Sequence, residues 1–296
     1  MKRRVIALGF FDGVHIGHAA LLKKARQLSD DMHLTACALT FDTHPDELVK
    51  GIRLPLLNTL SERRWLMQSL FGMDEMLVLH FDRNRMHQHW QDFVTRTLIE
   101  EYCAAYVVCG HDFRFGARGE GDPTRLAEKC RQLGVGCECI AEVKLDGETV
   151  SSTRIRGLLE NGETEKAVAL LGHPHIFIGK VIDGRKLGRT LGIPTANLSV
   201  DRGVLIPKYG VYAAKACFDD TEHLAVVNIG MRPTVSGQHV TIEPWILDFD
   251  GDLYGKELRL ELYAFLRAEK RFDSLEALRA QILRNAEQTR AYFQAM

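Results

Sequence analysis

Two histidines three residues apart follow a glycine-rich turn close to the start of the chain. The segment from Gly9 to His18 comes directly after a short apolar run and also contains Gly13, His15 and Gly17. Glycines at a strand-to-helix turn let the backbone approach a phosphate, and a helix N-terminus offers N–H donors and a positive dipole end. The spacing therefore predicts a nucleotide site in which both imidazoles stabilise charge on the α-phosphate. Two surface histidines on an ordinary turn, or a metal site without an evident third ligand, are the alternatives.

A second candidate phosphate site lies near the middle of the chain, just before a predicted helix. Ser151, Ser152 and Thr153 offer hydroxyl groups that cap the helix. Together with Arg156 they can grip a polyphosphate. A plain helix cap with exposed arginines has the same composition. The motif alone therefore favours the plain cap, and it indicates a phosphate site only in combination with the histidine motif.

A third candidate is the aromatic loop between Gly110 and Gly116, which follows a strand-like run. It contains Asp112, Phe113 and Arg114. The loop either stacks on the aromatic ring of a ligand or packs over the core of its own domain.

The second half of the chain carries a loop rich in glycine and cationic residues, followed by oxygen donors. Its predicted phosphate-binding residues are Gly179, Lys180, Gly184, Gly188, Arg189 and Pro194. Thr195 and Asn197 are hard oxygen donors of the kind that Mg²⁺ accepts beside phosphates. The residue order of a P-loop is absent. The loop suits a triphosphate with its metal, although a basic β-hairpin turn would have the same composition.

Alternating strands and helices must position the motifs of the first half. Strand-like runs cover 4–8, 34–41, 76–79, 105–109 and 135–140, and helical spacing covers 17–28, 61–71, 90–101, 123–133 and 153–160. This alternation predicts a parallel sheet with helices on both faces, in a Rossmann-like α/β domain. Ligands collect at the C-terminal ends of the strands in such sheets.

The pattern of predicted secondary structure changes near residue 172. Short β-rich runs follow at 176–182, 211–218, 224–229, 240–249 and 258–265, and a helix of about sixteen residues begins at Ser274. Repeated short strands with turn residues between them predict an antiparallel β-barrel with a terminal helix. We therefore expect an α/β domain over 1–165 and a β-barrel domain over 172–296.

Composition favours a soluble, cytoplasmic protein. The formal net charge is -1, from 38 Lys+Arg and 39 Asp+Glu, which does not favour binding of nucleic acid. No apolar run reaches the roughly 18 residues of a membrane span, and the basic start of the chain is not a convincing signal peptide. The seven cysteines form no disulfide pattern, and Cys137 and Cys139 are too closely spaced for a typical zinc pair. Reduced thiols and no membrane are expected, and no protein partner can be inferred.

The motifs of the first half resemble the adenylyltransferase domain of the bacterial bifunctional riboflavin kinase/FAD synthetase family. H-x-G-H at 15–18, G-x-D-F-R-F-G at 110–116 and S-S-T-x-I-R at 151–156 follow the order and spacing of that family. The resemblance implies that both histidines contact the phosphates of ATP and that the third motif closes on them. It also implies that the loop lines the nucleotide or flavin site. Residues 40–45 depart from the family's usual F-E-P-H-P, which leaves the role of Asp42 open.

The motifs of the second half resemble the riboflavin kinase domain of the same family, of which P-T-A-N at 194–197 is a specific signature. The other pieces follow in order at 210–213, 228–234, 243–249, 252–255 and 266–275. The resemblance implies that Glu243 is the catalytic base and that Gly210, Tyr212, Asn228, Arg232 and Arg267 bind the flavin. The family's usual Glu-x-His is Glu-Pro-Trp here, with Trp245 in the place of His.

The resemblance implies an enzyme with two activities. The C-terminal domain would phosphorylate riboflavin to FMN with ATP, and the N-terminal domain would transfer an adenylyl group from ATP to FMN, giving FAD and pyrophosphate, with Mg²⁺ as the cofactor. The alternatives are a protein with one active domain, a flavin-binding sensor or storage protein, or another nucleotidyltransferase fused to a barrel.

Overall fold

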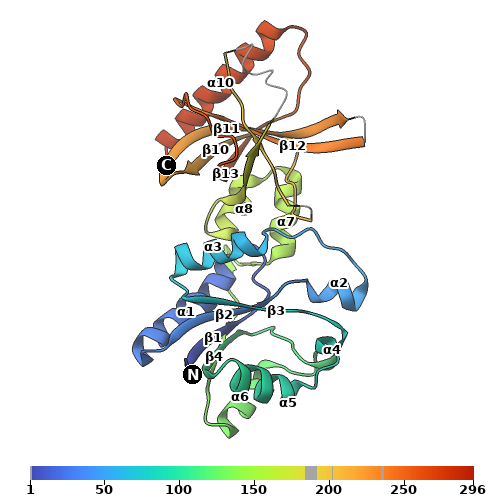
Figure 1. The fold of residues 1–296 in the computed structure, drawn as a ribbon, viewed down its shortest axis with the longest axis vertical. Helices are drawn as coiled ribbons and strands as arrows, with labels where there is room; N and C mark the ends of the chain where they lie inside the picture. Colours follow the sequence, from blue (N-terminus) through green and yellow to red (C-terminus); the bar gives the residue numbers. More distant parts are fainter. Residues whose placement is uncertain (1, 184–191, 202, 235–236) are drawn as a thin grey trace. The chain divides into compact units, whose positions relative to one another are not determined.

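A computed structural model describes residues 2–183, 192–201, 203–234 and 237–296, with the backbone alone for 232–234 and 237–239. The chain divides into two compact units (Figure 1). The first unit comprises Met1–Leu56 and Leu60–Ser151, and the second comprises Leu57–Thr59 and Ser152–Met296. Each unit has its own hydrophobic core.

The first unit is built on a parallel five-stranded sheet in the order β3-β2-β1-β4-β5. The strands are β1 (Arg4–Leu8), β2 (Thr35–Phe41), β3 (Glu75–Leu79), β4 (Ala104–Gly110) and β5 (Gly136–Ile140). The central strand β1 and its neighbour β4 are mostly apolar and buried, as expected for strands covered on both faces. The predicted Rossmann-like sheet is confirmed.

Helices cover both faces of this sheet (Figure 1). They are α1 (Ile16–Met32) and α3 (Leu60–Phe71) on one face, and α5 (Trp90–Asp92), η1 (Phe93–Glu101) and α6 (Pro123–Gln132) on the other. The helix predicted over 90–101 is present, but from Phe93 onward it is wound as a wider π-type helix. Short elements complete the unit: α2 (Pro45–Lys50), α4 (Arg83–Met86), η2 (Ala117–Gly119), β6 (Lys144–Leu145) and β7 (Glu148–Thr149).

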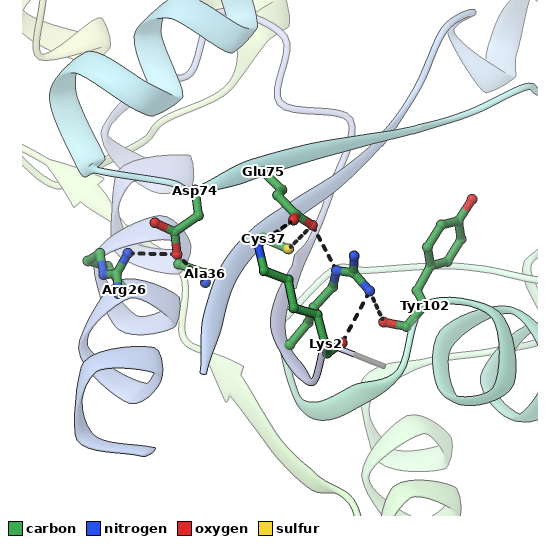
Figure 2. Close-up of polar contacts among 8 residues, drawn as sticks. Lys2, Arg26, Ala36, Cys37, Asp74, Glu75 and Tyr102 are labelled. Atoms are coloured by element: carbon green, nitrogen blue, oxygen red, sulfur yellow. Dashed lines mark hydrogen bonds and ion pairs between the residues drawn. The ribbon is translucent and has the colours of Figure 1, made fainter. Parts of the chain in front are cut away.

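Polar contacts tie the strands together where β1 to β3 begin (Figure 2). Arg4 Nε donates to the Glu75 carboxylate at 2.8 Å, and Arg4 Nη1 donates to the Tyr102 carbonyl at 3.1 Å. Asp74 accepts from the backbone N–H of Ala36 at 2.8 Å. The hydrogen bond from Arg4 is the main cause that lowers the pKa of Glu75. These contacts join the strands at their N-terminal ends. The loops of the candidate site follow the C-terminal ends of the strands, at the opposite side of the sheet.

The second unit begins with two helices, α7 (Ser152–Asn161) and α8 (Thr164–Leu171), and continues into a closed antiparallel barrel. Around the barrel the described strands run β10 (Gly210–Phe218), β11 (Thr221–Thr234), β12 (Gly237–Ile246), β9 (Asn197–Leu198), β8 (His175–Ile182) and β13 (Glu257–Ala268). Alternate side chains, such as Val227, Ile229 and Ile242, fill the interior. The predicted barrel is confirmed.

The terminal helix α10 (Leu275–Gln294) begins where the sequence predicts and has 20 residues, a few more than expected. The hydroxyl of Ser274 caps it by accepting from the Ala277 backbone N–H. The helix packs against the outer face of the barrel, where Val211, Val226 and Trp245 meet Ala286 of the helix. Trp245 therefore belongs to the contact between strand and helix. None of the helices in the described part of the chain has the length and apolar character needed to cross a membrane.

The buried histidine His175 should make the stability of the barrel depend on pH. His175 begins β8 and is 1% exposed. Its burial, with a smaller contribution from His173, lowers its pKa from 6.5 to about 3. The unfolded chain takes up a proton below its ordinary pKa and the folded barrel does not, so stability is lost as pH falls from 6.5 toward 3. The free energy of unfolding should drop by about 2 kcal/mol at pH 5 from this group alone.

Urea unfolding at pH 7.5 and pH 5 tests this expectation. The variant His175→Leu should lose less stability between the two pH values than the parent chain. His223→Leu, at a partly exposed histidine of the same barrel, serves as the control. An equal loss in parent and His175→Leu would contradict the assignment.

Candidate active sites

The turn after β1 is held in an unusual backbone conformation. Phe11, Gly13 and Val14 have φ values of 59°, 82° and 42°. Only glycine adopts this region without cost, and a β-branched residue there is an outlier. Both non-glycine residues are fully buried, so packing against the core compensates for the strain. Strained backbone of this kind concentrates at ligand-binding sites.

The two histidines predicted from the sequence lie together at the start of α1. His15 caps the helix, and its Nδ1 accepts a hydrogen bond from the backbone N–H of His18 at 3.3 Å. The two rings are stacked, with centroids 3.7 Å apart. Gly17 leaves room for this arrangement, because a Cβ there would lie 3.1 Å from the His15 ring. Gly9 likewise lies against the Phe11 ring.

His18 is an uncharged imidazole at neutral pH. Its burial lowers its pKa well below the usual value, and electrostatic interactions with His15 and Arg63 lower it further. Its Nδ1 is buried and has no hydrogen-bond partner among the described residues. A neutral ring with an unused nitrogen can form a hydrogen bond to a ligand of this turn, with the acceptor or donor role set by its tautomer.

Arg63 of α3 is a residue of this site that the sequence reasoning missed. It is fully buried, and its Nη1 donates to the Phe10 carbonyl at 2.8 Å and to the Thr40 hydroxyl at 3.0 Å. The Thr40 hydroxyl donates to the same carbonyl at 2.8 Å. Burial lowers the pKa of Arg63 to about 10, so it remains charged at neutral pH, close to Asp12. Its Nε and Nη2 have no hydrogen-bond partners in the described part of the chain.

We expect Arg63→Met to disrupt chemistry at this turn, because it removes both the anchor of the Phe10 carbonyl and a buried positive charge. A displacement of about 1 Å in a reacting group can cost about 10²-fold in rate. FAD formation should therefore fall between about 10- and 100-fold, whereas FMN formation should not change. Arg64→Met, at the neighbouring exposed arginine, is the matched control. Equal FAD rates in the two variants would contradict this role for Arg63.

The residue that departs from the family pattern, Asp42, lies at the end of β2. Its carboxylate accepts from the Phe81 backbone N–H at 3.0 Å and is 2.5 Å from Nδ1 of His80. Partial burial alone would raise the pKa of Asp42, but the hydrogen bonds from His80 and from the Phe81 backbone together outweigh this effect and lower the pKa. Nearby, His44 caps α2 and its ring meets the Phe10 ring edge-on.

The aromatic loop follows β4, at the edge of the sheet where ligands are expected. Phe113 and Phe115 are stacked with centroids 5.4 Å apart, and Phe115 is buried in the core. Asp112 and Arg114 are exposed, and Arg114 Nη1 is 3.8 Å from the Asp122 carboxylate. The loop thus packs one aromatic into the core and leaves polar side chains accessible to a ligand.

The Ser151–Arg156 motif lies at the N-terminus of α7. Arg156 is buried, and its Nη1 donates to the Thr153 hydroxyl at 3.3 Å. Ser152 is the first residue of the helix. Binding of a polyphosphate by these residues stays a prediction.

In the second unit, the P-T-A-N motif borders a cavity of about 320 Å³. Pro194, Thr195 and Ala196 line one side of it. The other lining residues are Val181, Gly192, Pro244, Ile246 and Phe249–Tyr254. The acidic residues of this wall, Asp250 and Asp252, were not predicted as site residues.

Glu243 lies on β12 beside this cavity. Its neighbour Pro244 lines the cavity, and the Pro244 carbonyl accepts from the Ala196 backbone N–H at 2.9 Å. Across the ladder Glu243 pairs with Asn228 of β11. Because β12 pairs with β9 through Ile242 and Leu198, the same register brings Asn197 opposite Glu243. Three residues predicted separately from the sequence are therefore neighbours on adjacent strands.

Several predicted ligand residues have structural contacts of their own. A Cβ on Gly179 would lie 2.0 Å from the Ser199 carbonyl, and one on Gly210 would lie 2.3 Å from the Arg267 carbonyl. Tyr212 is fully buried, and its hydroxyl donates to the Lys208 carbonyl. A ligand contact of these residues stays a prediction.

Two of the remaining predicted barrel residues, Arg267 and Lys180, are described in full by the structure, and the others are not. Arg267 Nε donates to Asn285 of α10 at 3.1 Å. Lys180 is exposed on β8. Gly184, Gly188, Arg189 and the side chain of Arg232 lie outside the described residues.

Family models match both halves of the chain. Residues 1–154 match FAD synthetase, and residues 171–293 match riboflavin kinase. Bifunctional riboflavin kinase/FMN adenylyltransferases of two bacteria illustrate the likeness. The protein of Listeria monocytogenes is 39% identical over 98% of this chain and 92% of its own length. The protein of Escherichia coli K12 is 36% identical over 98% of this chain and 92% of its own length.

A solved structure, described as a macrolide-efflux protein from Streptococcus pneumoniae, has the same fold. It superposes with a TM-score of 0.86 at 28% identity, over 98% of this chain and 94% of its own. The comparisons give no support to a sensor or to a protein with one active domain. The chain belongs to the bifunctional riboflavin kinase/FMN adenylyltransferase family, whose two activities make FMN from riboflavin and FAD from FMN.

Proposed function

We propose that the two activities occupy separate sites, with FMN adenylylation at the turn before α1 and riboflavin phosphorylation at the barrel cavity beside Glu243. The observation that supports this division most directly is the convergence of Glu243, Asn228 and the P-T-A-N segment on neighbouring strands. We also propose the domain limits 1–165 and 172–296 for these activities.

In the kinase step, ATP lies in the cavity lined by Thr195 and Asp252. Glu243, on the neighbouring strand, orients the 5′-hydroxyl of riboflavin and accepts its proton. The transition state of phosphoryl transfer is loose, so position and charge supply most of the acceleration. Asn228, directly opposite Glu243, is placed to hold the flavin against this base.

The donor set of the cavity fits Mg²⁺. Thr195 and Asn197 offer neutral oxygens, and Mg²⁺ in such sites takes few protein ligands and keeps phosphate oxygens and water. When bound, the ion neutralises charge on the transferring phosphoryl group. Thr195 lines the cavity and Asn197 begins β9, so both lie on the segment that borders the nucleotide.

In the adenylyl step, the FMN phosphate is already an anion and attacks the α-phosphate of ATP, with pyrophosphate leaving. No protein base is required. His18, neutral and with an unused nitrogen, forms a hydrogen bond to a phosphate oxygen, and His15 holds it in place through the stacked rings. The exposed Asp112 and Arg114 of the aromatic loop bind the nucleotide or the flavin. The phosphate contacts of Ser151, Ser152, Thr153 and Arg156 belong to the same proposal.

A cytoplasmic location is part of this proposal, because ATP is the co-substrate of both steps and all seven cysteines are free thiols. Only small molecules take part in the proposed reactions, so we expect no role for nucleic acid, a membrane or a protein partner.

Initial rates as a function of Mg²⁺ concentration test the kinase site. Thr195→Val should lower FMN formation by about tenfold or more and raise the Mg²⁺ concentration needed, because loss of a protein group that supports a bound metal typically costs about 10–100-fold in metal affinity or activity. FAD formation from supplied FMN should not change. Thr221→Val, at the exposed first residue of β11, is the control. An unchanged Mg²⁺ requirement in Thr195→Val would remove Thr195 from the metal site.

A further inference from the structure

Four of the seven cysteines gather on one face of the sheet in the first unit. Cys109 of β4 is the direct partner of Cys139 of β5 in the parallel ladder. Cys137 lies two residues before Cys139 and so points to the same face, and Cys130 of α6 packs against this face. The residue between them, Glu138, is paired with Lys24 of α1 at 3.2 Å, on the opposite face.

The four thiols form a row that runs from the surface to the core. The Cys139 thiol interacts with Cys109, Cys109 with Cys137, and Cys137 with Cys130. Cys139 is exposed, Cys137 is half-buried, and the other two are fully buried. The exposed end of the row is therefore the sulfur that a small oxidant meets first.

The pairing of Cys109 with Cys139 suits a disulfide. Neighbouring strands lie about 4.8 Å apart, and disulfides join residues whose Cα atoms are about 4.4–6.8 Å apart. Cys137 is diagonal to Cys109 in this register, since its own partner is Val107. Because two residues advance about 6.6 Å along a strand and neighbouring strands lie about 4.8 Å apart, the Cα atoms of this diagonal pair are about 8 Å apart, beyond that range. Cys109 is thus the resolving partner of Cys139.

A metal site fits these thiols less well. The structure shows one group of three potential ligand atoms within 4.8 Å of one another in its described part, and that group is Cys217, Glu222 and Glu261. The row of thiols is extended and does not converge on one point as the ligands of a tetrahedral metal ion do.

The row ends beside the candidate site of the adenylyl step. Cys109 is followed by Gly110, the first residue of the aromatic loop. The negative charge of Asp112 contributes to raising the pKa of Cys139, after the larger effect of partial burial, so the carboxylate and the thiol are close. The Phe113 backbone N–H donates to the Gly110 carbonyl at 3.2 Å. A new bond at Cys109 therefore acts on the base of this loop.

We propose that Cys139 and Cys109 are a reversible oxidation site at which peroxide forms a disulfide and slows FAD synthesis. Hydrogen peroxide oxidises the Cys139 thiolate to sulfenic acid, and hydroxide leaves. The Cys109 thiol then attacks this sulfur, and the S–S bond forms as water leaves. A dithiol reductant restores both thiols.

Formation of the disulfide can be measured by mass spectrometry, without an activity assay. The full chain is treated with hydrogen peroxide, free thiols are alkylated, and peptides are mapped by mass spectrometry. We expect a linked Cys109–Cys139 peptide pair that dithiothreitol removes, formed faster as pH rises because the thiolate is the reactive species. A linkage of Cys137 to Cys109 or to Cys130, or over-oxidised Cys139 without any linkage, would overturn the proposal.

The effect on FAD synthesis rests on the proposed function of the first unit, and it is measured on the same samples. FAD formation from FMN should fall about tenfold on oxidation and recover with dithiothreitol, while FMN formation should not change. Cys139→Ser should have the parent rate and resist peroxide, whereas Cys217→Ser in the barrel should remain sensitive.

The two failures are distinguishable. A linked peptide pair in a chain that makes no FAD before oxidation contradicts the function of the first unit and leaves the oxidation site intact. A linked pair with an unchanged FAD rate contradicts the regulatory half of the proposal.

Discussion

Replacing His18 by alanine should abolish FAD formation by the full chain and leave FMN formation at the parent rate. The variant removes a neutral imidazole whose unused nitrogen lies in the turn before α1. Loss of one preorganised hydrogen-bond donor to developing charge typically costs about 10²–10³-fold. Rates of FAD formation from supplied FMN and of FMN formation from riboflavin, measured by chromatography, give the two activities separately.

His87→Ala, at an exposed histidine of the same unit, is the matched control and should have parent rates in both assays. Because burial keeps the pKa of His18 well below its usual value, protonation of His18 should cause no fall in the FAD rate between pH 8 and pH 6. If His18→Ala lowered both activities together, the separation into two sites would be wrong.

Replacing Glu243 by glutamine should remove FMN formation and leave FAD formation intact, the reverse of the result expected for His18→Ala. General-base catalysis contributes about 10²–10⁴-fold, and the amide cannot accept the proton of the ribityl hydroxyl. Since the side chain keeps its shape, and Pro244 beside it still lines the cavity, ATP should bind as before. FAD formation from supplied FMN should not change.

Glu257→Gln, at an exposed glutamate at the start of β13, is the control. Titration of ATP into Glu243→Gln separates loss of chemistry from loss of binding. Near-parent FMN formation in Glu243→Gln would exclude Glu243 as the base and leave Asp250 and Asp252 of the cavity as candidates.

The sequence predicts both domains of this chain because their signals are local. The strand before Gly9 and the alternation that follows depend on apolar periodicity, and so does the terminal helix expected to begin at Ser274. The histidine pair and the P-T-A-N segment are contiguous motifs, so their members are neighbours in any fold. The same holds for the cysteines 137 and 139, whose separation along the chain is short.

What the sequence could not show depends on residues that meet through tertiary structure. Arg63 lies more than fifty residues from Phe10, and only the packing of α3 brings its guanidinium to that carbonyl. Cys109 and Cys130 complete the thiol row because β4 and α6 lie beside β5. Tyr212 differs in the other direction. It belongs to a motif whose residues are expected to bind the flavin, but it is fully buried in the barrel core.

The packing of Trp245 also required the structure. From the sequence, the tryptophan that replaces the family's usual histidine could lie beside the flavin or face outward. It packs with Val211 and Val226 against α10, and it is on the same side of β12 as Glu243, two residues away. The tryptophan is thus part of the apolar contact between the barrel and the terminal helix.

The most direct test of the account is a timed incubation of the purified full chain with riboflavin, ATP and Mg²⁺, in which riboflavin, FMN and FAD are separated by chromatography. FMN should appear first and FAD later, and FAD should appear without delay when FMN is supplied in place of riboflavin. Absence of both products, with flavin still bound to the protein, would contradict it.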